Sequence, residues 1–206
     1  MELLDYYDEK GNHLGTEDRK IVHEKALWHK TVHCWLFDKE GNVFFQRRAD
    51  RGTLYTTASG HVAAGESIKE AFGREIFEEL GTNIDYEKAE FCSVVNFTMD
   101  KEMKDGSIFK DRAFANIYVY NFDKEYDFNY DFDEVSEIVK VNALDTKKLF
   151  EKEEGSVNCQ TIKLLDGIIE VIDGEVEFNE FLVNEHETAL SKYGDILNKV
   201  IELTSK

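Results

Sequence analysis

The stretch Gly60–Thr82, GHVAAGESIKEAFGREIFEELGT, decides the fold of the chain around it. Ser67 with Glu70 three positions later forms a capping box, the pattern that begins a helix. Gly81 follows the apolar Leu80 and marks the expected end of that helix. The sequence therefore predicts a helix that begins near Ser67 and ends at Leu80.

The predicted helix has an acidic face and an apolar face. Glu75, Glu78 and Glu79 fall within one arc of about 100° on a helix with 3.6 residues per turn. A neighbouring stripe at i, i+4 and i+8 would hold the helix against a sheet, and it consists of Phe72, Ile76 and Leu80. The three carboxylates would then converge on one point in a cleft.

Carboxylates crowded at this spacing repel one another, and a divalent cation would relieve the repulsion. Oxygen ligands without thiolates suit Mg²⁺ or Mn²⁺, which bind through a few carboxylates together with substrate phosphates. The alternative is a solvated acidic face, common in so acidic a chain. The regular spacing of the whole stretch favours the cation site.

These residues resemble the signature of the Nudix family, in which Gly, Glu, Arg-Glu, an aliphatic residue, Glu-Glu and Gly recur at the same intervals. The signature positions are Gly60, Glu66, Arg74, Glu75, Ile76, Glu78, Glu79 and Gly81. The last slot is usually aliphatic and is Thr82 here, a departure expected to affect packing rather than metal binding. The resemblance implies a mixed sheet in an α/β/α sandwich, with metal-dependent cleavage of a diphosphate bonded to another moiety. It also implies that Glu75, Glu78, Glu79 and the Gly60 carbonyl hold the metal ions while Arg74 orients the carboxylates.

The composition limits the partners and the compartment. The chain has 206 residues, a formal net charge of -18 and three cysteines without CxxC spacing. Such acidity argues against a nucleic acid polymer and against an anionic membrane as partner. It would also repel a small diphosphate substrate unless cations intervene. With no apolar run of membrane-spanning length and no signal-like N-terminus, we expect a cytoplasmic protein with buried thiols.

The remaining chain predicts two parts. Residues 1–153 read as one domain with an N-terminal hairpin. Its expected elements are a strand at residues 2–7, a short helix capped by Thr16, a hairpin of 31–37 with 43–46, strands at 54–58, 90–98, 109–120 and 135–141, and a helix at 143–151. Residues 154–206 read as a helical extension, with helices at 159–172 and 178–203, that either covers the core or forms a homodimer interface.

A closer resemblance covers approximately residues 2–142. The runs RKIVHEKALWHKTVHCWLF, QRRA and SGHVAAGES, which begin at residues 19, 46 and 59, are similar to the Nudix branch that contains the isopentenyl-diphosphate isomerases. Three histidine ligands of the isomerase metal site fall on His23, His29 and His61, and a carboxylate ligand falls by a looser alignment on Asp111. We interpret this cluster as either a second metal site or a structural polar cluster.

Two departures favour hydrolysis over isomerisation. Where the isomerases carry a cysteine and a glutamate, this chain has Ser59 and Ala113. Isomerisation of an unactivated double bond needs an acid and a base on opposite faces, which serine and alanine do not supply. The leading hypothesis is therefore Mg²⁺-dependent hydrolysis of a nucleoside diphosphate or related diphosphate ester. Isomerisation of isopentenyl diphosphate and nucleotide binding without turnover are the alternatives.

Two roles stay open among residues outside the acidic helix. Arg47, Arg48 and Arg51 are either phosphate contacts or solvated surface residues. The general base is one of the helix glutamates or a loop acid such as Glu134 or Glu137.

Overall fold

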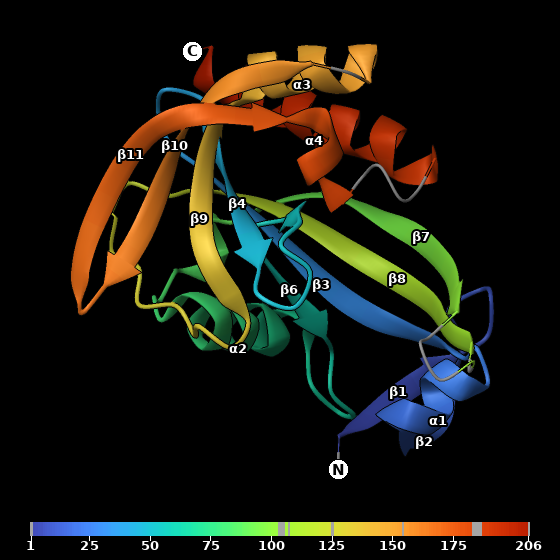
Figure 1. Ribbon diagram of the computed structural model, residues 1–206. Coiled ribbons are helices and arrows are strands. Elements are labelled where there is room, and N and C mark those ends of the chain that lie inside the picture. Colours follow the sequence, from blue (N-terminus) through green and yellow to red (C-terminus); the bar gives the residue numbers. More distant parts are fainter. Residues whose placement is uncertain are drawn as a thin grey trace.

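In the computed structural model a large sheet carries helix α2 on one face and helices α3 and α4 on the other (Figure 1). The structure describes residues 2–102, 106, 108–124, 126–153, 155–182 and 187–205. The strands are β1 Leu3–Tyr7, β2 His13–Asp18, β3 Trp28–Phe37, β4 Asn42–Arg48, β5 Leu54–Tyr55, β6 Ala58–His61, β7 Glu90–Glu102, β8 Ile108–Asn121, β9 Val135–Asn142, β10 Ser156–Leu165 and β11 Ile168–Glu177. The helices are α1 Arg19–Glu24, α2 Ile68–Leu80, α3 Ala143–Lys152 and α4 Glu187–Thr204, with short 3₁₀ turns at Tyr86–Lys88 and Phe178–Glu180. This confirms the predicted α/β fold with a mixed sheet and a C-terminal helix.

Helix α2 begins and ends where the sequence predicts. Ser67 is its N-cap, and both hydrogen bonds of the capping box with Glu70 are present. Gly81 takes the left-handed conformation at the C-cap, with φ of 66°. The apolar stripe of Phe72, Ile76 and Leu80 is buried, so the acidic face is fixed in direction.

Strands β3 and β4 separate after a single pair, Phe37 with Val43. Strand β3 then pairs with β6 and, in parallel, with β8, while β4 pairs with β5 and β9. The predicted hairpin of 31–37 with 43–46 therefore exists only at its turn. Strand pairing with more distant segments opens the sheet at this point.

Two local predictions need correction. Helix α1 is capped by Asp18 and not by Thr16, because the Asp18 side chain accepts from the Lys20 N–H and Thr16 lies within β2. The single strand predicted at residues 54–58 is two short strands, β5 and β6, which pair with different partners. The predicted N-terminal hairpin is present as β1 with β2.

The helix predicted over residues 159–172 is wrong, because β10 and β11 form a hairpin there. Its turn is Asp166–Gly167, with φ of 51° and 77°, as a two-residue turn of the Asp-Gly type requires. The helical spacing arose because Ile162 and Leu165 belong to one strand and Ile169 and Ile172 to the other. Strand β10 also pairs with β9 and so extends the central sheet.

The core has two clusters, one on each face of the sheet. Phe72, Ile76 and Leu80 of α2 belong to one cluster. Leu149 of α3 and Leu197 of α4 belong to the other. Among the described helices, none is long and apolar enough to cross a membrane.

Candidate active site

A cavity of about 500 Å³ lies where β3 and β4 separate. Its walls carry Glu75, Glu78 and Glu79 from α2, together with Gly60 and His61 from β6. The acidic face of α2 and strand β6, which precedes α2 in the chain, therefore line one cavity.

Gly60 lies directly against the carboxyl group of Glu75. A Cβ at position 60 would stand 2.0 Å from the Glu75 carboxyl carbon, far closer than any side chain tolerates. Glycine at this position therefore leaves room for the carboxylate. The backbone of β6 and the Glu75 side chain therefore meet inside the cavity.

Arg74 holds three carboxylates in fixed positions. Its Nε and Nη2 donate to Glu66, at 2.9 and 2.8 Å, and its Nη1 donates to Glu75 at 2.7 Å and to Glu78 at 3.0 Å. Nη2 also donates to the His61 carbonyl at 2.9 Å. Arg74 therefore links three carboxylates to the backbone of β6.

Glu79 is the most deeply buried of the three helix acids, with 4% exposure. Its Oε2 accepts hydrogen bonds from Gln46 Nε2 and from the Ser59 N–H, both at 3.0 Å. Burial raises the pKa of Glu79 well above its usual value, and burial likewise raises the pKa of Glu75 to about 7. Arg74 opposes this rise at Glu75, and Arg48 opposes it at Glu79, but the pKa of each carboxyl stays raised. A divalent cation would let both carboxylates ionise, and the oxygen donor set fits one such as Mg²⁺.

The three candidate arginines have different surroundings. Arg48 lines the cavity and donates from Nε to Asp50 at 2.9 Å. Arg47 is bound to Glu137 at 2.6 Å and to Glu180 at 2.8 Å. Arg51 donates to the other oxygen of Asp50 at 3.3 Å. Only Arg48 of the three is among the described residues that line the cavity.

The alternation of β4 explains this difference. Phe44 belongs to the α2 cluster and Phe45 to the α3 and α4 cluster, because successive side chains of a strand point to opposite faces. Gln46 reaches Glu79 on the α2 side, whereas Arg47 lies two positions after Phe45. The sequence interpretation missed Gln46 as part of the site, although its position in this alternation was visible.

The structure also separates the two candidate loop acids. Glu134 lines the cavity and acts electrostatically on both Glu75 and Glu79. Glu137 is bound by Arg47 and by Lys163. Of these two acids, Glu134 alone is positioned to take part in chemistry at the cavity.

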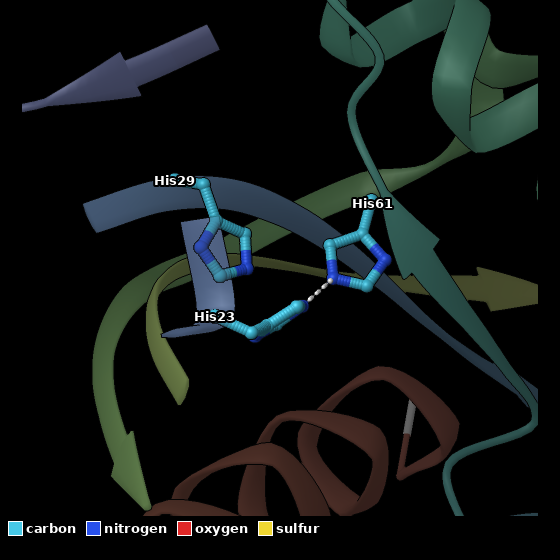
Figure 2. Close-up of side chains that lie close together, drawn as sticks. All are labelled: His23, His29 and His61. Carbon is cyan, nitrogen blue, oxygen red and sulfur yellow. Dashed lines mark hydrogen bonds between the residues drawn. The ribbon is translucent and has the colours of Figure 1, made fainter. Parts of the chain in front are cut away.

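His23, His29 and His61 converge from α1, β3 and β6, with ligand atoms within 4.8 Å of one another (Figure 2). His23 Nε2 lies 3.2 Å from His61 Nε2, and the His29 and His61 rings stack at 5.0 Å. His29 Nε2 lies 3.4 Å from Asp111 Oδ1. His61 and Asp111 also line the cavity that contains Glu75, Glu78 and Glu79, so this cluster and the glutamates open into one space.

The tautomers of these histidines leave unpaired acceptors at the centre of the cluster. His29 Nδ1 lies 3.1 Å from the Leu27 carbonyl, and His23 Nδ1 lies 3.0 Å from the Lys110 carbonyl. Both Nδ1 atoms must donate to these carbonyls, so in the neutral rings both Nε2 atoms are acceptors. His29 Nε2 and Asp111 Oδ1 are buried without a hydrogen-bond partner. Burial lowers the pKa of His29, although the Asp111 carboxylate opposes this shift. In the neutral form of His29 two acceptors face each other, an arrangement that fits a metal ion.

Comparison with known proteins gives a consistent result. The model of the NUDIX domain matches residues 27–159. An uncharacterized Nudix hydrolase of Clostridium acetobutylicum is 36% identical over 149 residues, which cover 68% of this chain and 69% of that protein. An isopentenyl-diphosphate delta-isomerase of Photorhabdus laumondii is 26% identical over 81% of this chain and 92% of its own length. A crystal structure of a Deinococcus radiodurans protein shares the fold, with a TM-score of 0.54 and 20% identity over 73% of this chain and 89% of that one.

Proposed function

The chain belongs to the Nudix domain family, and from this premise we propose that it is a metal-dependent hydrolase of a diphosphate bond. The substrate class is a nucleoside diphosphate or a related diphosphate ester, and the metal is Mg²⁺ or Mn²⁺. The observation that carries the proposal is the contact of Gly60 with Glu75 inside a cavity that also contains Glu78 and Glu79.

Each residue has a role in this proposal. Glu75, Glu78, Glu79 and the Gly60 carbonyl hold the metal ions, Arg74 keeps the carboxylates in place, and Arg48 contacts the phosphates. A bound divalent ion would neutralise phosphate oxygens and lower the pKa of a bound water. Glu134 is our candidate general base, because it faces the helix acids from the loop before β9.

The first experiment is phosphorus NMR of the purified protein with Mg²⁺ and a panel of nucleoside diphosphates, nucleoside diphosphate sugars, dinucleotides and isopentenyl diphosphate. Replacement of a diphosphate signal by monophosphate signals, dependent on Mg²⁺, is the expected result and identifies the substrate class. Survival of every diphosphate would exclude hydrolysis of this panel.

A variant tests the carboxylates. Glu79→Gln should abolish Mg²⁺-dependent turnover and leave the protein folded, because the amide oxygen still accepts from Gln46 and Ser59. The matched control is Glu87→Gln, an exposed acid bound to Lys69, which should retain activity. A folded and active Glu79→Gln protein would contradict the assignment.

Isomerisation of isopentenyl diphosphate is the second candidate, favoured by the histidine cluster in the same cavity. Ser59 and Ala113 argue against it, since neither provides the required acid or base. Proton NMR of the same samples tests it, because an isomerase would move the double bond of isopentenyl diphosphate without releasing phosphate.

We also propose that His23, His29, His61 and Asp111 bind a transition metal. Metal analysis of the purified protein should detect about one ion per chain, lost in His29→Gln and retained in the control His13→Gln. If the cluster is purely structural, Asp111→Asn should raise the melting temperature by removing a repulsive pair of acceptors. If it binds metal, the same substitution should lower both metal content and melting temperature.

A further inference from the structure

Tyr55 lies between the catalytic cavity and a second, small pocket. It lines the cavity that contains Glu75 and Glu79, and it also lines the small pocket together with Tyr193 of α4. Tyr55 therefore connects the C-terminal helix to the candidate active site.

The C-terminal segment holds the two-residue strand β5 at both of its residues. Leu54 forms a parallel bridge with Phe181, whose side chain is 1% exposed. Tyr55 forms a side-chain hydrogen bond with Tyr193. The Tyr193 ring is in turn packed against Trp35, with centroids 4.9 Å apart. Phe181 and Tyr193 both lie beyond residues 27–159, so the Nudix match does not include this support.

The hydrogen bond between these two hydroxyls uses one of two O–H donors, and its direction decides which donor stays free. Burial raises the pKa of both tyrosines. A phenol hydroxyl can accept one hydrogen bond while it donates another. When Tyr193 donates to Tyr55, the O–H of Tyr55 is left for an acceptor in the cavity that Tyr55 lines.

The surroundings of Tyr55 indicate which acceptor that is. Its ring meets His33 edge-on at 5.7 Å. It lies within electrostatic range of Asp111, Arg48 and Glu79, that is, of residues from both candidate metal sites and of the candidate phosphate contact. A phosphate held among these groups would offer a charged oxygen to a phenol donor.

We propose that Tyr55 donates a hydrogen bond to a phosphate oxygen of the bound diphosphate and that Tyr193 is its positioning residue. This inference rests on the proposed function, and it gives the C-terminal helix a part in substrate binding. A hydrogen bond to a charged oxygen predicts a loss of about 10- to 100-fold in kcat/KM on removal of the Tyr55 hydroxyl.

Single hydroxyl deletions test the proposal. Tyr55→Phe should lower kcat/KM by about 10- to 100-fold, and Tyr193→Phe should lower it less. The double variant should be no worse than Tyr55→Phe, because Tyr193 acts only through Tyr55. Tyr86→Phe is the matched control, since Tyr86 donates to the Tyr118 hydroxyl at 2.9 Å in a second tyrosine pair behind α2. It should retain wild-type kinetics with a comparable change in melting temperature.

Binding of imidodiphosphate in the presence of Mg²⁺, measured by calorimetry, separates this inference from the proposed function. If the wild type binds this probe but hydrolyses no diphosphate, a weaker dissociation constant in Tyr55→Phe would still support the contact. If the wild type hydrolyses diphosphates and Tyr55→Phe matches it in kcat/KM and in binding, the contact is wrong while the function stands. Additive losses in the double variant would show that Tyr193 does not act through Tyr55. A wild type that neither binds the probe nor hydrolyses any diphosphate would overturn both proposals.

Discussion

Position 60 shows how the absence of a Cβ leaves room for a neighbouring carboxylate. The Glu75 carboxylate occupies the space where any other residue would carry its Cβ. Gly73 lies on the same helix as Glu75 and has open space where a Cβ would lie. The two glycines therefore differ in role although both lie within the signature stretch.

Replacement of Gly60 by alanine should displace Glu75 and reduce Mg²⁺-dependent hydrolysis by at least about 100-fold, the effect expected when a catalytic group is misplaced by about an ångström. Gly73→Ala is the control and should keep activity, with a gain in stability of about 0.5–1 kcal/mol from the better helix former. Steady-state kinetics and thermal melts measure both. Equal activity of the two variants would mean that Glu75 does not need its present position.

The neighbouring residues Arg47 and Arg48 should respond oppositely to substitution. Arg48→Ala should raise KM about tenfold or more, because it removes a charged contact in the cavity, and should change stability little. Arg47→Ala should leave KM unchanged and cost about 1–3 kcal/mol of unfolding free energy, because Glu137 and Glu180 lose their partner. Kinetics with chemical denaturation distinguish the two outcomes, and a KM effect in Arg47→Ala would count against the assignment of faces.

At the scale of elements, both ends of α2 are specified by residues close to them in sequence. Its capping box and its left-handed C-cap are formed by residues within or next to the helix. The C-cap is also a tertiary contact, because a Cβ on Gly81 would stand 2.1 Å from the Asn129 carbonyl oxygen. The end of the helix and the segment leading to β9 are therefore packed without a gap.

Gly81→Ala should lower the free energy of unfolding by more than the roughly 1–2 kcal/mol that the left-handed conformation alone costs a residue with a Cβ. Gly194→Ala in α4, where the Cα faces open space, should instead be neutral or slightly stabilising. Urea denaturation of both variants measures the difference. Similar unfolding free energies for the two variants would show that the segment at Asn129 can shift at little energetic cost.

The turn between β3 and β4 predicts a pH dependence of stability. Asp38 accepts from the N–H groups of Glu40 and Asn42 and is bound to Lys140 at 2.8 Å. Burial acts to raise the pKa of Asp38, but the bonds with Asn42 and Lys140 outweigh burial and hold the pKa below its ordinary value.

Because the folded pKa is the lower one, the charged carboxylate stabilises the fold above the unfolded pKa of about 3.9, and this contribution is lost as the pH falls through the folded value. Asp38→Asn should therefore cost about 1–3 kcal/mol at pH 7. The difference from the wild type should shrink toward zero in acid. Unfolding free energies measured from pH 7 down to about pH 3 test this, and a difference independent of pH would contradict the ionic origin.

At the scale of the whole molecule, residues beyond 153 are part of the core. Strand β10 extends the central sheet at β9, and α4 contributes to the same cluster as Trp35 and Phe45. The buried side chains supplied by this segment include Ile162, Leu164, Val176, Phe178, Phe181, Ile196, Leu197 and Val200.

A fragment of residues 1–153 should therefore not fold cooperatively. Each fully buried large apolar side chain is worth roughly 1.5–3 kcal/mol, so the loss of this set is as large as or larger than a typical domain stability of about 5–15 kcal/mol. Circular dichroism melts of the fragment test this. Full-length Leu197→Ala, expected to lose about 2–5 kcal/mol but to stay folded, is the reference, and a cooperative transition in the fragment would contradict the prediction.

The sequence alone determined helix α2, its caps and the direction of its carboxylates, because these depend on residues no more than four apart. It also indicated the strands with clear alternation, such as β8 and β9. The hairpin of β10 and β11 was missed, although Asp166–Gly167 is a turn signal, because apolar residues of paired strands can mimic a helical period.

What only the tertiary structure decided is which distant residues meet. The separation of β3 from β4 and the side of the sheet on which Arg47 and Arg48 lie depend on strand pairing. The meetings of Gly60 with Glu75 and of His29 with Asp111 were expected only from the family resemblance, because local sequence does not bring such distant residues together. Pairing partners are chosen by hydrogen bonds and packing across long stretches of chain. Local sequence therefore specified the chemical groups of this site, and the sheet brought them together.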